Sequence, residues 1–304
     1  MSDELIRPVR QFNRTVTQRI GALNEEYLAR ARPLGASRVL WEIGDDGADA
    51  RAIRARLDLD SGYLSRLLRR LEADGLVRVT PATDDHRVRV VRLTQAGRAE
   101  RAELDRRSDE LARALLAPLN DRQRGRLLDA MATVEKLLTA GLVEITIQDP
   151  TGSDAQYCLR SYFAELDSRF DGGFDPGASI QVAAAELVEP AGLFLVAQIR
   201  GEPAGCGALK LHGGEPAELK RMWVAASARG LGVGRRILAE LEQHARQRGA
   251  TAVRLETNRT LTEAIGLYLS AGYVEIPAFN DEPYAHHWFE KHFSNPAVSS
   301  TPDR

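Results

Sequence analysis

Residues 229–236 of this 304-residue chain read Arg229-Gly230-Leu231-Gly232-Val233-Gly234-Arg235-Arg236. The stretch lies between a predicted strand at 218–224 and a predicted helix at 235–248. Glycines in alternate positions let the backbone approach a ligand without hindrance from Cβ atoms. Amide N–H groups at a helix N-terminus attract anions such as phosphate. The stretch therefore predicts a phosphate-binding turn, although it matches neither a Walker loop nor the Gly-x-Gly-x-x-Gly dinucleotide fingerprint.

Strands and helices alternate on both sides of this turn, from about residue 145 to the end of the chain. We predict strands at 144–148, 193–199, 205–211, 218–224, 252–257, 273–276 and 287–291, and helices at 153–170, 235–248 and 261–270. This alternation indicates an α/β domain with a mixed sheet. We place the domain boundary at about residue 145, which gives domains of 1–145 and 146–304.

The first 145 residues are predicted to be mainly helical, with helices expected at 6–28, 36–43 and 48–57. The best-marked helix is 61–74, where Asp60 or Ser61 can cap the start and Gly75 can end it. Two short strands, 76–80 and 88–93, then flank a charged loop. This order is that of a helix-turn-helix followed by a β-hairpin wing. Four leucines of helix 61–74 have the i, i+3, i+4, i+7 spacing of a core-facing stripe: Leu64, Leu67, Leu68 and Leu71.

Charge is unevenly distributed along the chain. The net charge is −2, but residues 51–98 hold 11 Arg against six acidic residues, a local excess of +5. Such a window favours a polyanionic partner such as DNA. In a helix-turn-helix the second helix contacts base edges, arginine reads guanine, and serine or tyrosine more often contacts phosphate. The expected DNA-facing residues are Ser61, Gly62, Tyr63, Ser65, Arg66 and Arg69 on the helix, with Arg87 and Arg89 on the hairpin.

The hairpin sequence resembles the wing of the MarR family. Asp85-His86-Arg87 is followed by Leu93-Thr94-Gln95-Ala96-Gly97, and 71–77 is similar to the end of that family's recognition helix. The resemblance covers about residues 5–140. It implies a dimer formed by the first and last helices that binds a pseudo-palindromic operator. By this resemblance Asp85 braces the wing and Arg87 reaches the DNA. A winged helix that serves only in packing or dimerisation is the alternative.

The glycine-rich turn resembles the acetyl-CoA signature of the GNAT acetyltransferases, Arg/Gln-x-x-Gly-x-Gly/Ala. The resemblance covers about residues 145–293 and extends through 218–224 and 264–273. It implies acetyl-CoA as co-substrate and a central sheet splayed between strand 218–224 and the next strand. Main-chain groups of Met222, Trp223 and Val224 would then hold pantetheine. The pyrophosphate would bind the amides of 230–235, a run that contains Gly230, Leu231, Gly232, Val233, Gly234 and Arg235, with Arg229 adding charge.

Three further residues are candidates for the acetyl-transfer site. Tyr268 matches the family's helix tyrosine, which protonates or holds the departing sulfur; its alternative role is a core aromatic. Glu218 can deprotonate the amine if burial raises its pKa, or it can simply pair with Lys220 or Arg254. Asn258 either binds pantetheine or the acceptor, or satisfies its own turn. The family's asparagine seven residues before the tyrosine is replaced here by Leu261.

The sequence therefore predicts two domains, a mainly α winged helix and an α/β GNAT fold. The expected function is that of a dimeric, operator-binding regulator that also transfers acetyl to an amine, either a small molecule or a protein lysine. The alternatives are an acetyl-CoA-sensing regulator without turnover and an acetyltransferase whose winged helix only dimerises. We expect no metal cofactor, no membrane association and a cytoplasmic location, nucleoid-associated when DNA is bound. Two cysteines are too few for a disulfide framework.

Overall fold

The computed structural model describes residues 3–23, 27–30, 32–81, 89–213 and 215–293. The chain forms two compact units, Met1–Thr133 and Val134–Arg304. The division falls inside helix α6 (Asp121–Ala140).

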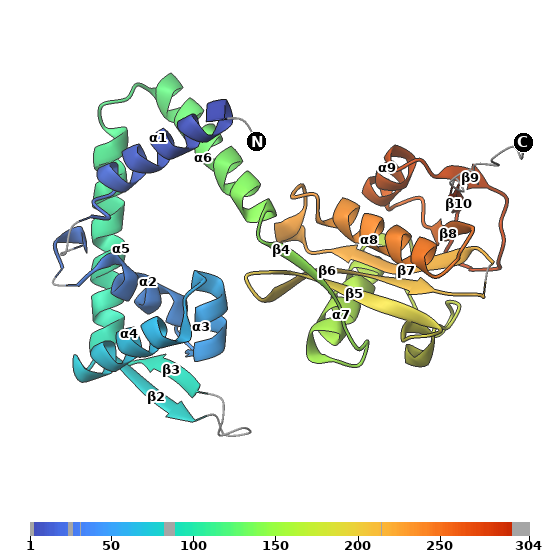
Figure 1. Cartoon of the computed structure of the whole chain (residues 1–304), viewed down its shortest axis with the longest axis horizontal. Helices are drawn as coiled ribbons and strands as arrows, with labels where there is room; N and C mark the ends of the chain where they lie inside the picture. Colours follow the sequence, from blue (N-terminus) through green and yellow to red (C-terminus); the bar gives the residue numbers. More distant parts are fainter. Residues whose placement is uncertain (1–2, 24–26, 31, 82–88, 214, 294–304) are drawn as a thin grey trace, which may run out of the picture. The chain divides into compact units, whose positions relative to one another are not determined.

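The first unit is mainly helical (Figure 1). Its small sheet has the order β1-β3-β2 and is antiparallel throughout. Before α6, the elements in chain order are α1 (Asp3–Arg19), η1 (Tyr27–Ala29), α2 (Leu34–Ile43), β1 (Ala48–Asp49), α3 (Ala50–Leu57), α4 (Ser61–Ala73), β2 (Val77–Pro81), β3 (Arg89–Leu93) and α5 (Gln95–Leu116).

Local signals account for most of these helices. The side chain of Asp60 accepts a hydrogen bond from the amide of Tyr63 at 2.8 Å and so caps α4. All four leucines of the predicted stripe are buried in one core. Thr94 caps α5 by accepting from the amide of Gly97 at 3.0 Å. The helix predicted for 6–28 is too long: α1 ends at Arg19, and Gly21 follows with a φ of +67°, a conformation that stops a helix.

The second unit is built on a seven-stranded sheet with the order β4-β5-β6-β7-β8-β10-β9. All neighbouring strands are antiparallel except β7 and β8, which are parallel. The elements are β4 (Val143–Ile147), α7 (Ser153–Arg169), η2 (Ala184–Leu187), β5 (Gly192–Ile199), β6 (Glu202–Lys210), β7 (Ala217–Val224), η3 (Ala226–Ala228), α8 (Val233–Gln247), β8 (Ala252–Thr257), α9 (Thr262–Ser270), β9 (Val274–Ile276) and β10 (His287–His292).

The two faces of the sheet pack against different helices. Along β5, Leu193 and Leu195 point into the core that contains α8, whereas Phe194 and Val196 point into the core that contains Cys158 of α7. Successive side chains of a strand face opposite sides, so this alternation requires a helix on each face. Figure 1 shows α7 and α8 on opposite sides of the strands.

The sheet opens between β7 and β8. The two strands pair only at Ala217 with Val253 and at Glu218 with Arg254. One step further along β7, a bulge sets two residues, Arg221 and Met222, against one residue of β6. Arg221 adopts a φ of +57°, which non-glycine residues seldom do. Beyond the bulge the main chain of β7 therefore runs free of β8, as the predicted splay requires.

Among the helices in the described part of the chain, none combines the length and the apolarity needed to cross a bilayer.

Candidate functional site

A cavity of about 390 Å³ lies where β7 separates from β8. Met222, Trp223 and Val224 contribute its strand wall. The glycine-rich turn and the N-terminus of α8 form the end of the cavity, while α7 and α9 contribute its sides. We call it the larger cavity. Of the eleven residues expected at a coenzyme site, nine line it, and the other two, Leu231 and Asn258, lie elsewhere.

The glycine-rich turn presents unpaired amides to the larger cavity. Gly232 caps α8 with a φ of +80°, and Gly230 has a φ of +75°, so both take a backbone conformation suited to glycine. A Cβ on Gly232 would meet no atom within 4 Å. The first amide of this region with an intrahelical acceptor is that of Arg236, which donates to the carbonyl of Gly232 at 3.0 Å. Five earlier amides find no acceptor within the described residues: Gly230, Gly232, Val233, Gly234 and Arg235.

The side chains around the turn divide between packing and charge. Leu231 and Val233 pack into the core beneath the turn, so their contribution to the site is the main chain. Arg229 is held by Glu165, whose carboxylate accepts from the guanidinium at 2.6 Å. Arg235 donates to the Ser270 hydroxyl at 3.2 Å. The turn therefore combines free amides with two guanidinium groups at the positive end of a helix.

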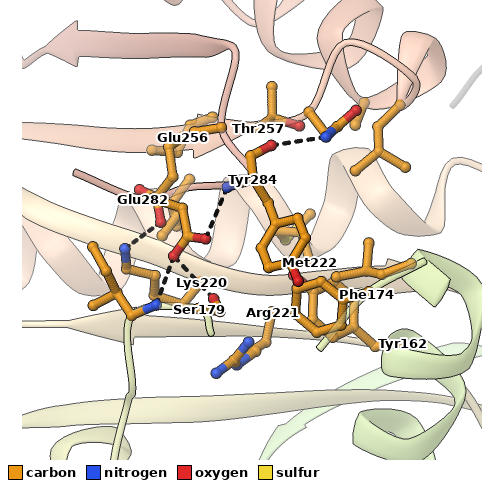
Figure 2. A pocket seen from close by; sticks show the side chains of 18 of the residues that line it. Tyr162, Phe174, Ser179, Lys220, Arg221, Met222, Glu256, Thr257, Glu282 and Tyr284 are labelled. Atoms are coloured by element: carbon orange, nitrogen blue, oxygen red, sulfur yellow. Dashed lines mark hydrogen bonds and ion pairs between the residues drawn. The ribbon is translucent and has the colours of Figure 1, made fainter. Parts of the chain in front are cut away.

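A smaller cavity, of about 90 Å³, adjoins the larger one and is shown in Figure 2. The two share lining residues from α7, β7 and α9, including Tyr162, Met222 and Tyr268. The aromatic wall of the smaller cavity includes Phe174 and Tyr284, whose ring centroids are 4.8 Å apart. A molecule in the smaller cavity therefore meets one in the larger cavity beside Tyr268.

Tyr268 lies at the junction of the two cavities, on α9. Its residue is 5% exposed. Burial raises the pKa of its hydroxyl well above the usual value of 10. At neutral pH the hydroxyl therefore keeps its proton and can donate it.

Glu218 lacks the raised pKa that its role as a general base would require. It is bound to Arg254 at 2.7 Å and lies 3.2 Å from Lys220. Burial raises the pKa of its carboxyl, but the two cations lower it by more, so the pKa lies below its ordinary value. Glu218 is also absent from the described lining of both cavities. The geometry matches the ion-pair alternative.

A second acidic residue, Glu256, lies on β8 beside the splay. It lines the smaller cavity, and its Oε1 accepts from Lys220 at 2.5 Å. Its Oε2 is buried and has no hydrogen-bond partner within the described part of the chain. An unpaired buried carboxylate oxygen is costly unless a ligand completes it. The sequence offered one signal for this residue, an acidic side chain near the end of a strand beside the splay.

Asn258 holds its own turn and the neighbouring loop. Its Oδ1 accepts from the amide of Thr260 at 2.9 Å, and its Nδ2 donates to the carbonyl of Tyr284 at 2.7 Å. The loop is held a second time by Glu282, which accepts from the Ser179 hydroxyl and the Ile180 amide. Asn258 thus shapes the smaller cavity, in agreement with the turn alternative.

The first unit presents the expected nucleic-acid surface on α4. The residues of the leucine stripe face the core, whereas Ser61, Gly62, Ser65, Arg66 and Arg69 are exposed. Tyr63 is half-buried and packs partly against that core. Arg89, at the start of β3, is exposed, while Asp85 and Arg87 lie outside the described residues. Six of the nine expected residues are therefore exposed, and five of them lie on one face of α4.

Comparison with known proteins supports both resemblances. An IAA acetyltransferase from Azospirillum brasilense is 38% identical over 134 residues, which are 43% of this chain and 86% of that protein. The model of the acetyltransferase (GNAT) family matches residues 159–273. The chain belongs to the GNAT acetyltransferase family. A crystal structure of a GNAT-family acetyltransferase from Staphylococcus aureus MU50 matches 49% of this chain and 98% of its own, with 16% identity and a TM-score of 0.42.

The first unit of this GNAT protein carries a MarR-family domain, since the MarR family model matches residues 32–88. The HTH-type transcriptional regulator TtmR from Methylorubrum extorquens is 43% identical over 67 residues, which are 22% of this chain and 33% of that regulator. The chain thus spans about a third of the length of this regulator. The predicted fusion of a MarR-type domain with an acetyl-CoA-dependent GNAT domain is confirmed.

Proposed function

We propose that this protein binds operator DNA as a dimer through its MarR-type domain and transfers acetyl from acetyl-CoA to an amine through its GNAT domain. The observation that carries the enzymatic part is the set of five free amides, Gly230 and residues 232–235, at the end of a cavity that reaches Tyr268. This arrangement suits a long ligand with phosphate at one end and a reactive group at the other.

We assign the pyrophosphate to the free amides and to Arg229 and Arg235. Pantetheine lies along the open edge of β7, where Met222 and Val224 offer main-chain groups that β8 does not pair. This places the acetyl thioester at the junction of the two cavities. The acceptor amine then approaches from the smaller cavity.

The acetyl transfer needs one group that accepts a proton and one that donates a proton. The unpaired Oε2 of Glu256 takes one proton from the ammonium and passes it to solvent, and it takes a second proton from the nitrogen as that atom attacks. The nitrogen forms its bond to the acetyl carbon as the carbon–sulfur bond breaks. The hydroxyl of Tyr268 gives its proton to the departing sulfur and regains one through solvent. Lys220, which holds Oε1 of Glu256, positions the carboxylate.

We propose that the acceptor amine is a small molecule. The smaller cavity is bounded by the aromatic wall and by the loop that Asn258 and Glu282 hold down. The relative from Azospirillum brasilense is named an IAA acetyltransferase. We do not propose that this protein and that relative act on the same acceptor.

Thiol release from acetyl-CoA with a panel of small amines tests the enzymatic part. We expect turnover that falls at least about 100-fold in Glu256→Gln. The matched variant Glu218→Gln should retain far more activity, because its carboxylate lies outside both cavities. Tight coenzyme binding without turnover on any amine would instead support an acetyl-CoA-sensing regulator.

For the MarR-type domain, the exposed face of α4 supports DNA binding, and exposed apolar side chains support dimerisation. These apolar residues are Leu5, Val9 and Phe12 on α1, and Leu128 and Met131 on α6. We expect operator affinity to fall steeply with salt. Replacing Arg66 and Arg69 by Ala should weaken binding and flatten the salt dependence, whereas Arg113→Ala on α5 should not. A flat salt response of the wild-type protein would contradict DNA binding.

A further inference from the structure

Arg221 is a cation without a carboxylate partner in the smaller cavity of the GNAT domain. Two cations line the described part of that cavity, Lys220 and Arg221. Lys220 is neutralised by Glu256 at 2.5 Å and Glu218 at 3.2 Å. Arg221 makes no ion pair with any described residue, and its guanidinium lies over the ring of Phe163, 4.8 Å from the centroid. Its positive charge is therefore available to a ligand.

Arg221 has a backbone conformation that residues other than glycine seldom adopt. The bulge in β7 interrupts the regular alternation of side chains between the two faces of the sheet. Four successive residues around it, 219–222, line the smaller cavity. Arg221 reaches this position with a φ of +57°. Strained residues of this kind cluster at binding sites. In Figure 2 the Arg221 side chain lies below Tyr284.

The same cavity holds an unpaired group of the opposite charge. Oε2 of Glu256 is buried and lacks a partner within the described residues. The cavity therefore offers one site for a carboxylate, at Arg221, and one for an ammonium group, at Glu256. Phe174 and Tyr284 form an aromatic wall of the same cavity.

We propose that the acceptor is a free α-amino acid, or a close amino-carboxylate analogue, whose carboxylate binds Arg221 while its amine meets Glu256. This inference rests on the proposed acetyl transfer and specifies its substrate class. A guanidinium binds a carboxylate through two parallel hydrogen bonds, which gives selectivity as well as affinity. A protein lysine has no carboxylate beside its amine and would leave Arg221 unused.

The test compares three amino acids, phenylalanine, leucine and methionine, each with its own amide, which keeps the amine and lacks the carboxylate. For at least one pair we expect kcat/KM of the amino acid to exceed that of the amide by about 10- to 100-fold, chiefly through KM. Arg221→Gln should bring the ratio close to one, and Arg221→Lys should retain part of it. Arg259→Gln, an exposed arginine that does not line either cavity in the described structure, should keep the wild-type ratio. Melting temperatures of all variants check that they fold.

A second readout does not depend on turnover. It is the calorimetric titration of each amino acid and each amide into the wild-type protein with CoA present. Acetylation of acids and amides at equal rates, or a ratio that Arg221→Gln leaves unchanged, would overturn the amino-acid inference and leave the proposed function standing. Binding of amino acids but not amides, without any turnover, would support the inference and contradict the proposed function. Neither turnover nor binding would overturn both.

Discussion

Two glycines at opposite ends of α8 allow the role of the glycine-rich turn to be separated from its contribution to folding. Gly232 caps the N-terminus with a φ of +80°, and Gly249 follows the C-terminus with a φ of +82°. A Cβ at either position would meet no atom within 4 Å. The two substitutions Gly232→Ala and Gly249→Ala are therefore closely matched in backbone strain and in packing.

Both variants should lose the same modest stability. A left-handed conformation costs an L-residue roughly 1–2 kcal/mol, and the smaller entropy of the unfolded alanine chain offsets part of this. We expect a net loss of about 1 kcal/mol, which corresponds to about 2–4 °C in the melting temperature of a unit of this size.

The variants should differ in acetyl-CoA binding. The new methyl group of Gly232→Ala lies in the open space beside the free amides, where we place the pyrophosphate. Displacing the phosphate from one charged hydrogen bond costs about 1.5–3 kcal/mol, or about 10- to 100-fold in Kd. Gly249→Ala should leave Kd unchanged, because that position is remote from the described lining of both cavities. Calorimetric titration with acetyl-CoA measures both values. Equal Kd values for the two variants would refute the assignment of the pyrophosphate to this turn.

Three further predictions concern catalysis and stability. Tyr268→Phe should lower kcat by about 100-fold in the thiol-release assay with little change in acetyl-CoA Kd, because the hydroxyl acts as a proton donor; an unchanged kcat would refute that role. Since burial raises the pKa of Tyr268 above its usual value, wild-type kcat should show no loss from tyrosine ionisation between pH 7 and pH 9, and a fall in that range that disappears in Tyr268→Phe would contradict the reasoning. In the MarR-type domain, Arg30 lowers the pKa of the Glu100 carboxyl. The Glu100 carboxylate therefore stabilises the fold fully above the pKa that it has in the unfolded chain. This stabilisation is lost as the pH falls through the lower pKa of the folded state. Glu100→Gln should therefore cost about 1–3 kcal/mol of unfolding free energy at pH 7, with the difference shrinking in acid, and a pH-independent difference in urea titrations would contradict this.

Features that depend on neighbouring residues in the sequence were predictable. The leucine spacing of α4, its Asp60 cap and the glycine-rich turn each act within a few residues, and the structure confirms their conformations. The end of α1 was not predicted: the helix stops at Arg19, where Gly21 turns the backbone away. On α6, the apolar side chains of Leu128 and Met131 are exposed in the single chain.

The chemistry of the smaller cavity depends on pairing between strands, which the sequence does not reveal. Glu218 and Glu256 are both acidic residues on strands beside the splay. The parallel register places Arg254 opposite Glu218 and so pairs that carboxylate. The bulge that turns Arg221 into the cavity arises from a shift of β7 against β6, and nothing in the local residues marks it. The sequence therefore indicated the glycine-rich turn but not the residues of the smaller cavity.

The most direct test of the account is the amide NMR spectrum of the protein with and without CoA. We predict that the amide signals of Gly230, Gly232, Val233, Gly234 and Arg235 shift strongly and that their hydrogen exchange slows when CoA is added, because these amides gain phosphate oxygens as acceptors. If CoA binds while these five signals and their exchange rates stay unchanged, the central claim is contradicted.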